Sequence, residues 1–252
     1  MWNLKTKMAG SGRYPREKII VILPAYNEEG KIGLVVTKIL AEKTADKVIV
    51  VDDGSTDKTR EEAASAGAQV LAHGKNMGVG AGIRDGIEFA RENTFTIAVV
   101  MGGDDQDNPD EMRRLLDPIA HDHFVFVQGS RYMPGGVRMN IPLFRRVTTG
   151  LFSIILRRLV GFPVTDGTNG YRAFRLSIFD NPAIDLRQEW LNHYELEPYI
   201  YCKVIQLGLN VTEAPVTKRY PKTHKGYTKM VPILSWWSIL RPLIYLKLGI
   251  KR

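Results

Sequence analysis

Three short runs of β-branched and other apolar residues each lead into paired acidic side chains. The runs cover residues 19–23, 48–51 and 97–101, and Asp or Glu follows each of them within a few positions. Short apolar runs of this kind are typical of buried parallel strands. Because ligands bind beyond the carboxyl ends of the strands in an open α/β sheet, we expect these acidic loops to converge on one site.

Segments with helical periodicity separate these runs from one another and from two further apolar runs at 68–72 and 124–128. Helices are predicted at residues 31–45, 56–66, 78–92 and 109–119. This alternation predicts an α/β fold with a single Rossmann-like, mostly parallel sheet covered by helices on both faces. After Gln128 the alternation stops, and an amphipathic helix is predicted at 144–160.

Length and composition agree with one globular domain. The chain has 252 residues, of which 44% are hydrophobic, and this is enough to bury one sizeable core. We assign residues 18–229 to that domain, residues 1–17 to a polar flexible leader and residues 230–252 to an amphipathic C-terminal segment. The single cysteine, Cys202, excludes an internal disulfide and fits a reducing compartment. The leader lacks the apolar centre of a signal peptide.

Basic residues are concentrated in two zones that contain no acidic residue, one between Asp122 and Asp166 and one after Glu213. The rest of the chain has more acidic than basic residues, so the net charge of +8 arises in these zones. Such polarity predicts an anionic partner on one face. Nucleic acid is disfavoured because the chain has no helix-turn-helix, zinc-ligand spacing or RNA-recognition signature. Interleaved Trp, Leu and Ile favour an anionic membrane surface instead.

The C-terminal segment is apolar but interrupted. Pro232, Arg241, Pro242 and Lys247 break it into pieces too short to span a bilayer, which needs about 20 apolar residues. We expect this segment to lie in the membrane interface. A helix that packs on the core or forms a dimer remains the alternative.

Carboxylates gathered at strand ends suit a divalent cation, whose preferred ligands are carboxylate and phosphate oxygens. The acidic loops therefore predict a metal–nucleotide site, although some of the same residues could simply cap helices. The glycines between Gly78 and Gly82 open a predicted helix and invite a dinucleotide-binding interpretation. Asp85 occupies the position of the last glycine in that motif, which argues against it.

Five segments carry a family resemblance in their order along the chain. They are PAYNEE (24–29), VDDGSTD (51–57), GGDDQDNPDE (102–111), GSRYMPGG (129–136) and DGTNGYRAF (166–174). Together they resemble the family 2 glycosyltransferases of GT-A fold, and most closely the dolichyl-phosphate mannose and glucose synthase group. The resemblance implies a Mg²⁺- or Mn²⁺-dependent, inverting transfer of a sugar from a UDP- or GDP-sugar to a polyprenyl phosphate such as dolichyl or undecaprenyl phosphate. It also implies an enzyme bound peripherally at the cytoplasmic membrane face, for which a homo-oligomer is one option.

The resemblance assigns residues to the nucleotide-sugar and the metal. The nucleotide-binding residues are expected to be Pro24, Ala25, Tyr26, Glu28, Val51, Asp53, Gly103, Asp104, Gln106 and Arg219, with Lys225 and Lys229 from a mobile basic loop. Asp104 matches the second carboxylate of the family's DXD metal motif, and Asp105 and Gln106 are further candidate ligands. Gly102 stands where the first carboxylate belongs, so either Asp105 or Asp107 supplies the missing carboxylate, or the metal binds through a single carboxylate together with phosphates and water.

The same resemblance places acceptor residues in the first basic zone. Arg131 and Arg145 match phosphate-holding arginines and, with Asp104, are the expected catalytic residues, while Thr149 and Asp166 complete the acceptor set. Guanidinium groups suit phosphate because they bind it through two parallel hydrogen bonds. A lipid phosphate is already ionised and needs no general base. Two alternatives remain: transfer to a soluble or polysaccharide hydroxyl, and a catalytically weak membrane-binding subunit, which Gly102 would suit.

Overall fold

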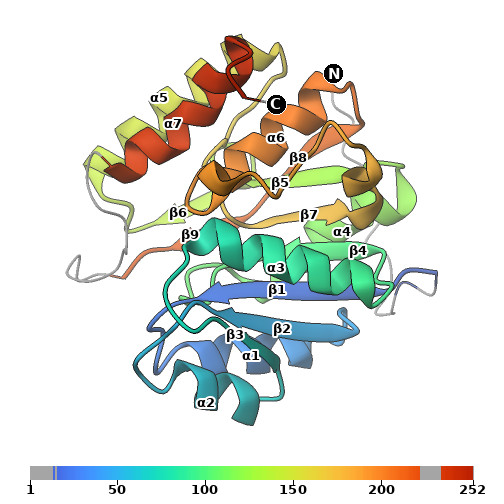
Figure 1. Cartoon of the computed structure of the whole chain (residues 1–252), viewed down its shortest axis with the longest axis vertical. Helices are drawn as coiled ribbons and strands as arrows, with labels where there is room; N and C mark the ends of the chain where they lie inside the picture. Colours follow the sequence, from blue (N-terminus) through green and yellow to red (C-terminus); the bar gives the residue numbers. More distant parts are fainter. Residues whose placement is uncertain (1–13, 15, 222–233, 252) are drawn as a thin grey trace.

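The computed structural model describes residue 14, residues 16–221 and residues 234–251, and a seven-stranded sheet lies at its centre (Figure 1). The strand order is β3-β2-β1-β4-β7-β5-β8. The strands are β1 (Ile19–Ala25), β2 (Lys47–Asp52), β3 (Gln69–Ala72), β4 (Ile97–Val100), β5 (Phe126–Ser130), β7 (Arg172–Arg175) and β8 (Val211–Pro215). All five predicted strands form, so the predicted single, mostly parallel sheet is confirmed.

The second half of the sheet departs from the simple alternation. Strand β7 lies antiparallel between β4 and β5, and β8 then pairs in parallel with β5 at the edge. A second sheet joins two short strands, β6 (Val137–Met139) and β9 (Thr217–Arg219), in parallel. This small sheet brings the first basic zone against the second.

Helices cover both faces of the large sheet, because alternate residues of each strand point to opposite sides. On one face α3 (Val79–Glu92) packs with α5 (Leu143–Val160), α6 (Leu196–Gln206) and α7 (Leu234–Lys247). On the other face lie α1 (Ile32–Ala41), α2 (Thr59–Ser65) and α4 (Met112–His121). Ile20 and Ile22 of β1 enter the first core, whereas Val21 and Leu23 enter the second.

Three predicted helix boundaries were wrong. Helix α1 ends at Ala41 rather than at residue 45, because Lys43 adopts a positive φ of 53° that no helix continues through. Helix α2 begins at Thr59 rather than at residue 56, because the Asp57 carboxylate accepts the Thr59 N–H at 3.0 Å. The helix predicted from residue 109 starts as a single 3₁₀ turn, Pro109–Glu111, before α4. Three further 3₁₀ and helical segments of the second half, η2 (Leu176–Asp180), η3 (Glu189–Leu191) and α6, were not predicted.

Helices α5 and α7 lie side by side along one edge of the molecule (Figure 1). Helix α5 matches the predicted amphipathic helix and ends at Val160, before the capping residue Gly161, whose φ of 68° favours glycine. Helix α7 contains Pro242 and contacts both α5 and α6. Among the residues that the structure describes, no helix is both long and apolar enough to cross a membrane. Nearly all of the predicted leader, together with Lys225 and Lys229, lies outside the described residues.

Candidate functional site

A cavity of about 820 Å³ opens at the carboxyl ends of β1, β2 and β4. All three acidic loops reach it, through Glu28, Asp53 and Asp104, as their strand-end positions predict. Pro24, Ala25, Tyr26 and Gly103 also line this end. Residues of α5, α6 and α7 form the opposite end. The cavity therefore runs from the acidic loops toward these three helices.

Asp53 shapes the acidic end by holding a loop in place. Its Oδ1 accepts the Met77 N–H at 2.7 Å and its Oδ2 accepts the Gly78 N–H at 2.8 Å. The His73 ring lies between two carboxylates, with Nδ1 2.7 Å from Asp53 Oδ1 and Nε2 2.9 Å from Asp85 Oδ2. Asp53 is 4% exposed. Its carboxylate therefore fixes the segment that leads into α3, and this segment forms part of the cavity wall.

The glycines at the start of α3 have a packing role. A Cβ on Gly80 would lie 2.1 Å from the Leu191 carbonyl oxygen, and one on Gly78, which has a φ of 101°, would lie 2.3 Å from the Asn192 carbonyl oxygen. The Ala81 N–H donates to that Asn192 oxygen at 3.0 Å. These glycines let the helix approach the 191–193 segment, which accounts for the motif without a dinucleotide.

The loop after β4 presents Asp104 to the cavity and turns Asp105 away from it. Asp104 lines the cavity, and its Oδ1 accepts the Gln106 N–H at 3.2 Å. Asp105 adopts a positive φ of 59° and pairs with Lys38 of α1, with 2.6 Å between Nζ and Oδ1. Asp105 is not among the cavity-lining residues. The carboxylate of Asp104 is thus the one of this pair that can meet a bound nucleotide.

Asp107 is buried behind Asp104 and pairs with Lys218 of β9. The Lys218 Nζ lies 2.8 Å from Asp107 Oδ2, which also accepts the Gly102 N–H at 3.3 Å. Burial lowers the pKa of Lys218, but the Asp107 and Asp104 carboxylates outweigh burial and raise it. Burial raises the pKa of Asp107, and Lys218 opposes that shift. Lys218 lines the cavity, a position that no sequence motif predicted.

Arg131 and Asp166 form a buried ion pair beside the cavity. The Arg131 Nε and Nη2 donate to the two Asp166 oxygens at 2.6 and 2.7 Å, and Nη1 and Nη2 donate to the hydroxyls of Tyr220 and Thr168 at 2.7 Å each. Burial raises the pKa of Asp166, but Arg131 outweighs burial and holds it below its ordinary value. A guanidinium has five N–H donors, so four of those of Arg131 are already used.

Arg145 and Thr149 lie on α5 at the far end of the cavity. Both line it, and Arg145 is half-buried with its guanidinium 5.4 Å from the centroid of the Tyr220 ring. The Thr149 hydroxyl donates to the Arg145 carbonyl oxygen at 2.7 Å and also bonds with the Tyr132 hydroxyl. The helix thus carries a cation and a hydroxyl into the cavity one turn apart.

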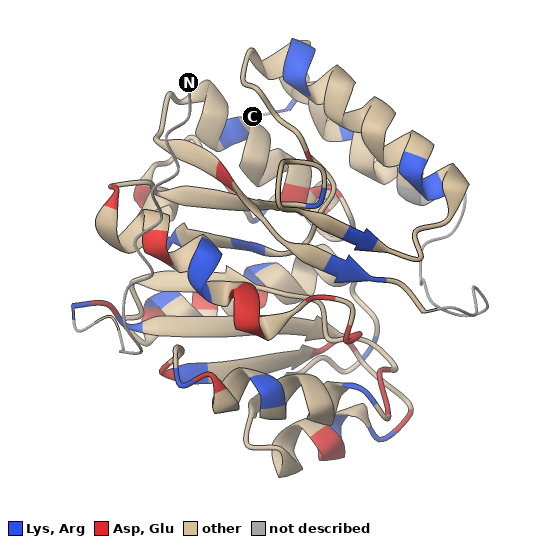
Figure 2. Cartoon of the chain, turned by 180° about the vertical axis from the view of Figure 1, so that it is seen from behind, with Lys and Arg blue, Asp and Glu red and all other residues tan. Residues whose placement is uncertain are grey.

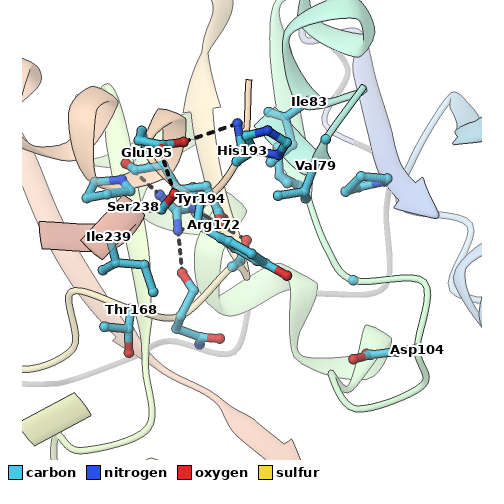
Figure 3. A pocket seen from close by; sticks show the side chains of 18 of the residues that line it. Val79, Ile83, Asp104, Thr168, Arg172, His193, Tyr194, Glu195, Ser238 and Ile239 are labelled. Atoms are coloured by element: carbon cyan, nitrogen blue, oxygen red, sulfur yellow. Dashed lines mark hydrogen bonds and ion pairs between the residues drawn. The ribbon is translucent and has the colours of Figure 1, made fainter. Parts of the chain in front are cut away.

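The wall opposite Asp104 is tied together by Glu195 (Figure 3). Glu195 is fully buried, and its Oε1 accepts the Ser238 hydroxyl and pairs with Arg241, both of α7. Its Oε2 accepts the His193 N–H at 3.1 Å. Because Trp237 and Ile239 of α7 also line the cavity, this contact makes α7 part of the site.

Other predicted site residues lie near the cavity without lining it. Val51 is buried in the core, Gln106 is 7% exposed behind Asp104, and Asp166 is buried beneath Arg131. Arg219 is exposed and lies on the strand face opposite to Lys218. Its backbone N–H donates to the Gln106 carbonyl oxygen at 2.8 Å.

The acidic end fits a divalent cation that is held largely by its substrate. Within the described part of the chain, no group of three or more His, Cys, Asp or Glu side chains is placed to hold an ion. Asp104 lines the cavity, and the buried Asp107 Oδ1 behind it has no hydrogen-bond partner. Mg²⁺ is commonly bound by one or two carboxylates together with substrate phosphates and water. One pocket-facing carboxylate therefore suffices when a diphosphate completes the ligand set.

Comparison with known proteins places this geometry in context. The family model Glycosyl transferase family 2 matches residues 20–181. The chain is 32% identical over 250 residues to a UDP-N-acetylglucosamine–dolichyl-phosphate N-acetylglucosaminyltransferase of Methanococcus voltae, covering 92% of this chain and 96% of that one. It is 31% identical over 222 residues to a polyprenol monophosphomannose synthase of Mycolicibacterium smegmatis, covering 86% and 82%.

A solved structure with the same fold is glucosyl-3-phosphoglycerate synthase from Mycobacterium tuberculosis, crystallised with Mn²⁺, uridine diphosphate and phosphoglyceric acid. Its TM-score is 0.69 at 19% identity, over 94% of this chain and 81% of that one. This likeness confirms the expected GT-A architecture.

Proposed function

This chain belongs to glycosyl transferase family 2, and we propose that it moves a sugar from a UDP- or GDP-sugar to a polyprenyl phosphate. The observation that carries the proposal is the two-ended cavity, with the acidic loops at one end and Arg145, Thr149 and the helices α5, α6 and α7 at the other, where the carboxylates of Glu195 and Glu197 are paired with Arg241 and Arg172. Curated relatives named for dolichyl- and polyprenyl-phosphate transfer match this chain over most of its length.

The donor belongs at the acidic end. Tyr26, Glu28 and Asp53 line the part of the cavity beyond β1 and β2, where a nucleoside would bind, and Asp104 faces the diphosphate. A divalent cation, Mg²⁺ or Mn²⁺, when bound through Asp104, supplies Lewis-acid stabilisation of the departing diphosphate. Mn²⁺ and Mg²⁺ accompany uridine diphosphate in neighbours of this fold.

The acceptor phosphate belongs beside α5. Arg145 and Thr149 line that end, and Arg131 adds a buried positive charge whose geometry Asp166 fixes. A phosphate oxygen held there attacks the anomeric carbon from the side opposite the diphosphate, so the configuration inverts. The phosphate is ionised before it attacks, so the step needs no side chain to remove a proton.

The lipid chain of the acceptor is proposed to leave the cavity along α5 and α7. Exposed apolar side chains on these helices are Leu143, Phe144, Val147, Leu151, Ile154, Trp237 and Ile244, and the exposed Leu248 follows α7 directly. Lys and Arg are the charged residues of both helices, and Figure 2 shows blue and no red along α5. Residues 230–252 would thus lie on an anionic membrane surface, at its cytoplasmic face, beside the catalytic domain of residues 18–229.

A matched pair of acceptors tests the proposal. The purified chain is incubated with UDP- and GDP-sugars, Mn²⁺, and either a polyprenyl phosphate or the polyprenol of equal length. We expect a glycosylated product from the phosphate and none from the alcohol. Product formed from polyprenol or free sugars but not from the phosphate would show a hydroxyl acceptor, and no product from any pair would favour a binding subunit.

A further inference from the structure

We propose that Lys218 is a built-in cation that binds the donor diphosphate, and that Asp107 holds it in position. The proposal rests on the proposed nucleotide-sugar function and adds a residue to it. Lys218 lines the cavity together with Gly102, Gly103 and Asp104, and its Nζ lies 2.8 Å from Asp107 Oδ2.

The backbone fixes this lysine against the acidic loop from both sides. Asp107 and Lys218 form an isolated antiparallel bridge, and the neighbouring Arg219 N–H donates to the Gln106 carbonyl oxygen at 2.8 Å. On the other side, the Thr217 N–H donates to Glu111 at 2.6 Å. The side chain of Lys218 is 12% exposed and that of Asp107 is fully buried. The ammonium is therefore held at the cavity surface with its counterion behind it.

Gly102 explains why a lysine suits this place. A Cβ on Gly102 would lie 3.1 Å from Asp104 Oδ1 and 3.6 Å from Asp107 Oδ2, so a carboxylate there would be crowded by two others. In the loop after β4, Asp104 is the carboxylate that lines the cavity, and Lys218 of β9 adds an ammonium group beside it. The missing carboxylate makes the site less negative than a two-carboxylate metal motif, and the Lys218 ammonium lies at the cavity surface with its counterion Asp107 buried behind it. A diphosphate should consequently bind with less dependence on a divalent cation.

A second Lys–Asp pair on the same loop supplies the control. Lys38 and Asp105 are 2.6 Å apart, with side chains 47% and 33% exposed, and neither lines the cavity. Both lysines thus neutralise an aspartate of residues 104–107, but only Lys218 faces the proposed donor. Lys38→Met removes the same charge from the exterior of the loop.

The experiment measures uridine and guanosine diphosphate binding by calorimetry, in EDTA and in Mn²⁺, together with the melting temperature. We expect the wild type to bind one of them in EDTA, and Lys218→Met to weaken that binding about tenfold to a hundredfold, the worth of a charged hydrogen bond. Mn²⁺ should restore part of the loss. Lys218→Arg should keep most of the affinity, and Lys38→Met should match the wild type.

The double variant Asp107→Asn with Lys218→Met separates binding from stability. It removes both members of the buried pair, so its melting temperature should recover relative to Lys218→Met while its EDTA affinity stays low. If the double variant, or Lys218→Met itself, bound the nucleotide as tightly as the wild type, Lys218 would be only a structural counterion. A wild type that binds neither nucleotide under any condition would overturn this inference and the proposed function together.

Discussion

The Arg131–Asp166 pair lets two buried charges coexist, and its removal should be costly. Asp166→Asn leaves the guanidinium of Arg131 buried without its anion, which costs about 3–5 kcal/mol in such pairs. We expect urea unfolding at neutral pH to show a loss of that size. An unchanged free energy of unfolding would mean that water replaces the carboxylate, because the Tyr220 hydroxyl already accepts a hydrogen bond from Arg131.

The same pair predicts how stability varies with pH. Arg131 holds the pKa of folded Asp166 below its unfolded value of about 4. The ionised carboxylate therefore stabilises the fold at pH values above 4, and this contribution is lost as pH falls through the lower folded pKa. We therefore expect the free energy of unfolding, measured from pH 7 to pH 2, to fall less steeply toward low pH for Asp166→Asn than for the wild type.

Asp104 and Asp105 are adjacent in sequence but face different surroundings. Asp104→Ala should remove the Mn²⁺-dependent part of nucleotide binding, a loss of about tenfold or more. Asp105→Ala should have a much smaller effect, because its carboxylate pairs with Lys38 outside the cavity. Calorimetric titration of nucleotide with and without Mn²⁺ compares them, and equal losses would contradict the assignment of Asp104 as the ligand.

Individual residues were predictable where a strand end fixes their position. Asp53 and Asp104 reach the cavity because β2 and β4 end just before them. The sequence could not show whether Lys218 or Arg219 lines the cavity. That choice depends on how the three-residue strand β9 pairs with β6. That pairing joins segments far apart in sequence, and no local pattern encodes it.

At the scale of elements, the apolar strands β1, β2 and β4 were visible because both faces of each are buried. Strand β7 was hidden, since its four-residue sequence, RAFR, has only two apolar residues and an arginine at each end. Arg172 is nevertheless only 2% exposed. Its burial is tolerated because Glu197 forms an ion pair with it at 2.9 Å and nearby carbonyl oxygens accept hydrogen bonds from its other N–H groups. Tertiary partners thus convert a polar segment into a central strand.

The contact between α3 and the 191–193 segment gives a prediction at this scale. Gly80→Ala would place a Cβ 2.1 Å from the Leu191 carbonyl oxygen, so we expect about 1–3 kcal/mol of destabilisation from overpacking. Gly150→Ala in α5 is the matched helical control, because its Cβ meets nothing within 4 Å and alanine favours helix by up to about 1 kcal/mol. Chemical unfolding of both variants should therefore give shifts of opposite sign.

At the scale of the whole molecule, the acidic loops and the basic helix α5 lie at opposite ends of the cavity. The acidic loops follow β1, β2 and β4, whereas Arg145, Arg146, Arg157 and Arg158 lie on α5. The distribution of charged residues along the sequence predicted an anionic partner on one face, because the acid-free zones are contiguous. It could not predict that α7 would close the cavity wall, which depends on the buried contact of Glu195 with Ser238 and Arg241.

The exposed apolar surface of α5 provides the last prediction. Phe144 and Leu151 are 69% and 55% exposed and do not line the cavity, so Phe144→Ala with Leu151→Ala should lower binding to anionic vesicles by at least about tenfold. Binding should also weaken with salt, because exposed charges are screened beyond about 8–10 Å. The matched control is Leu34→Ala with Leu40→Ala on α1, which covers the opposite face of the sheet.

Vesicle sedimentation, nucleotide titration and the oligomeric state in solution should be measured on all three proteins. The α5 variant should lose vesicle binding and keep nucleotide affinity, since its changed side chains lie outside the cavity. Trp236 is a poor choice for this test because it packs against the core, whereas Trp237 is 49% exposed but lines the cavity. If the wild type bound no vesicles and the α5 variant instead converted an oligomer to a monomer, this face would be a contact between copies of the chain.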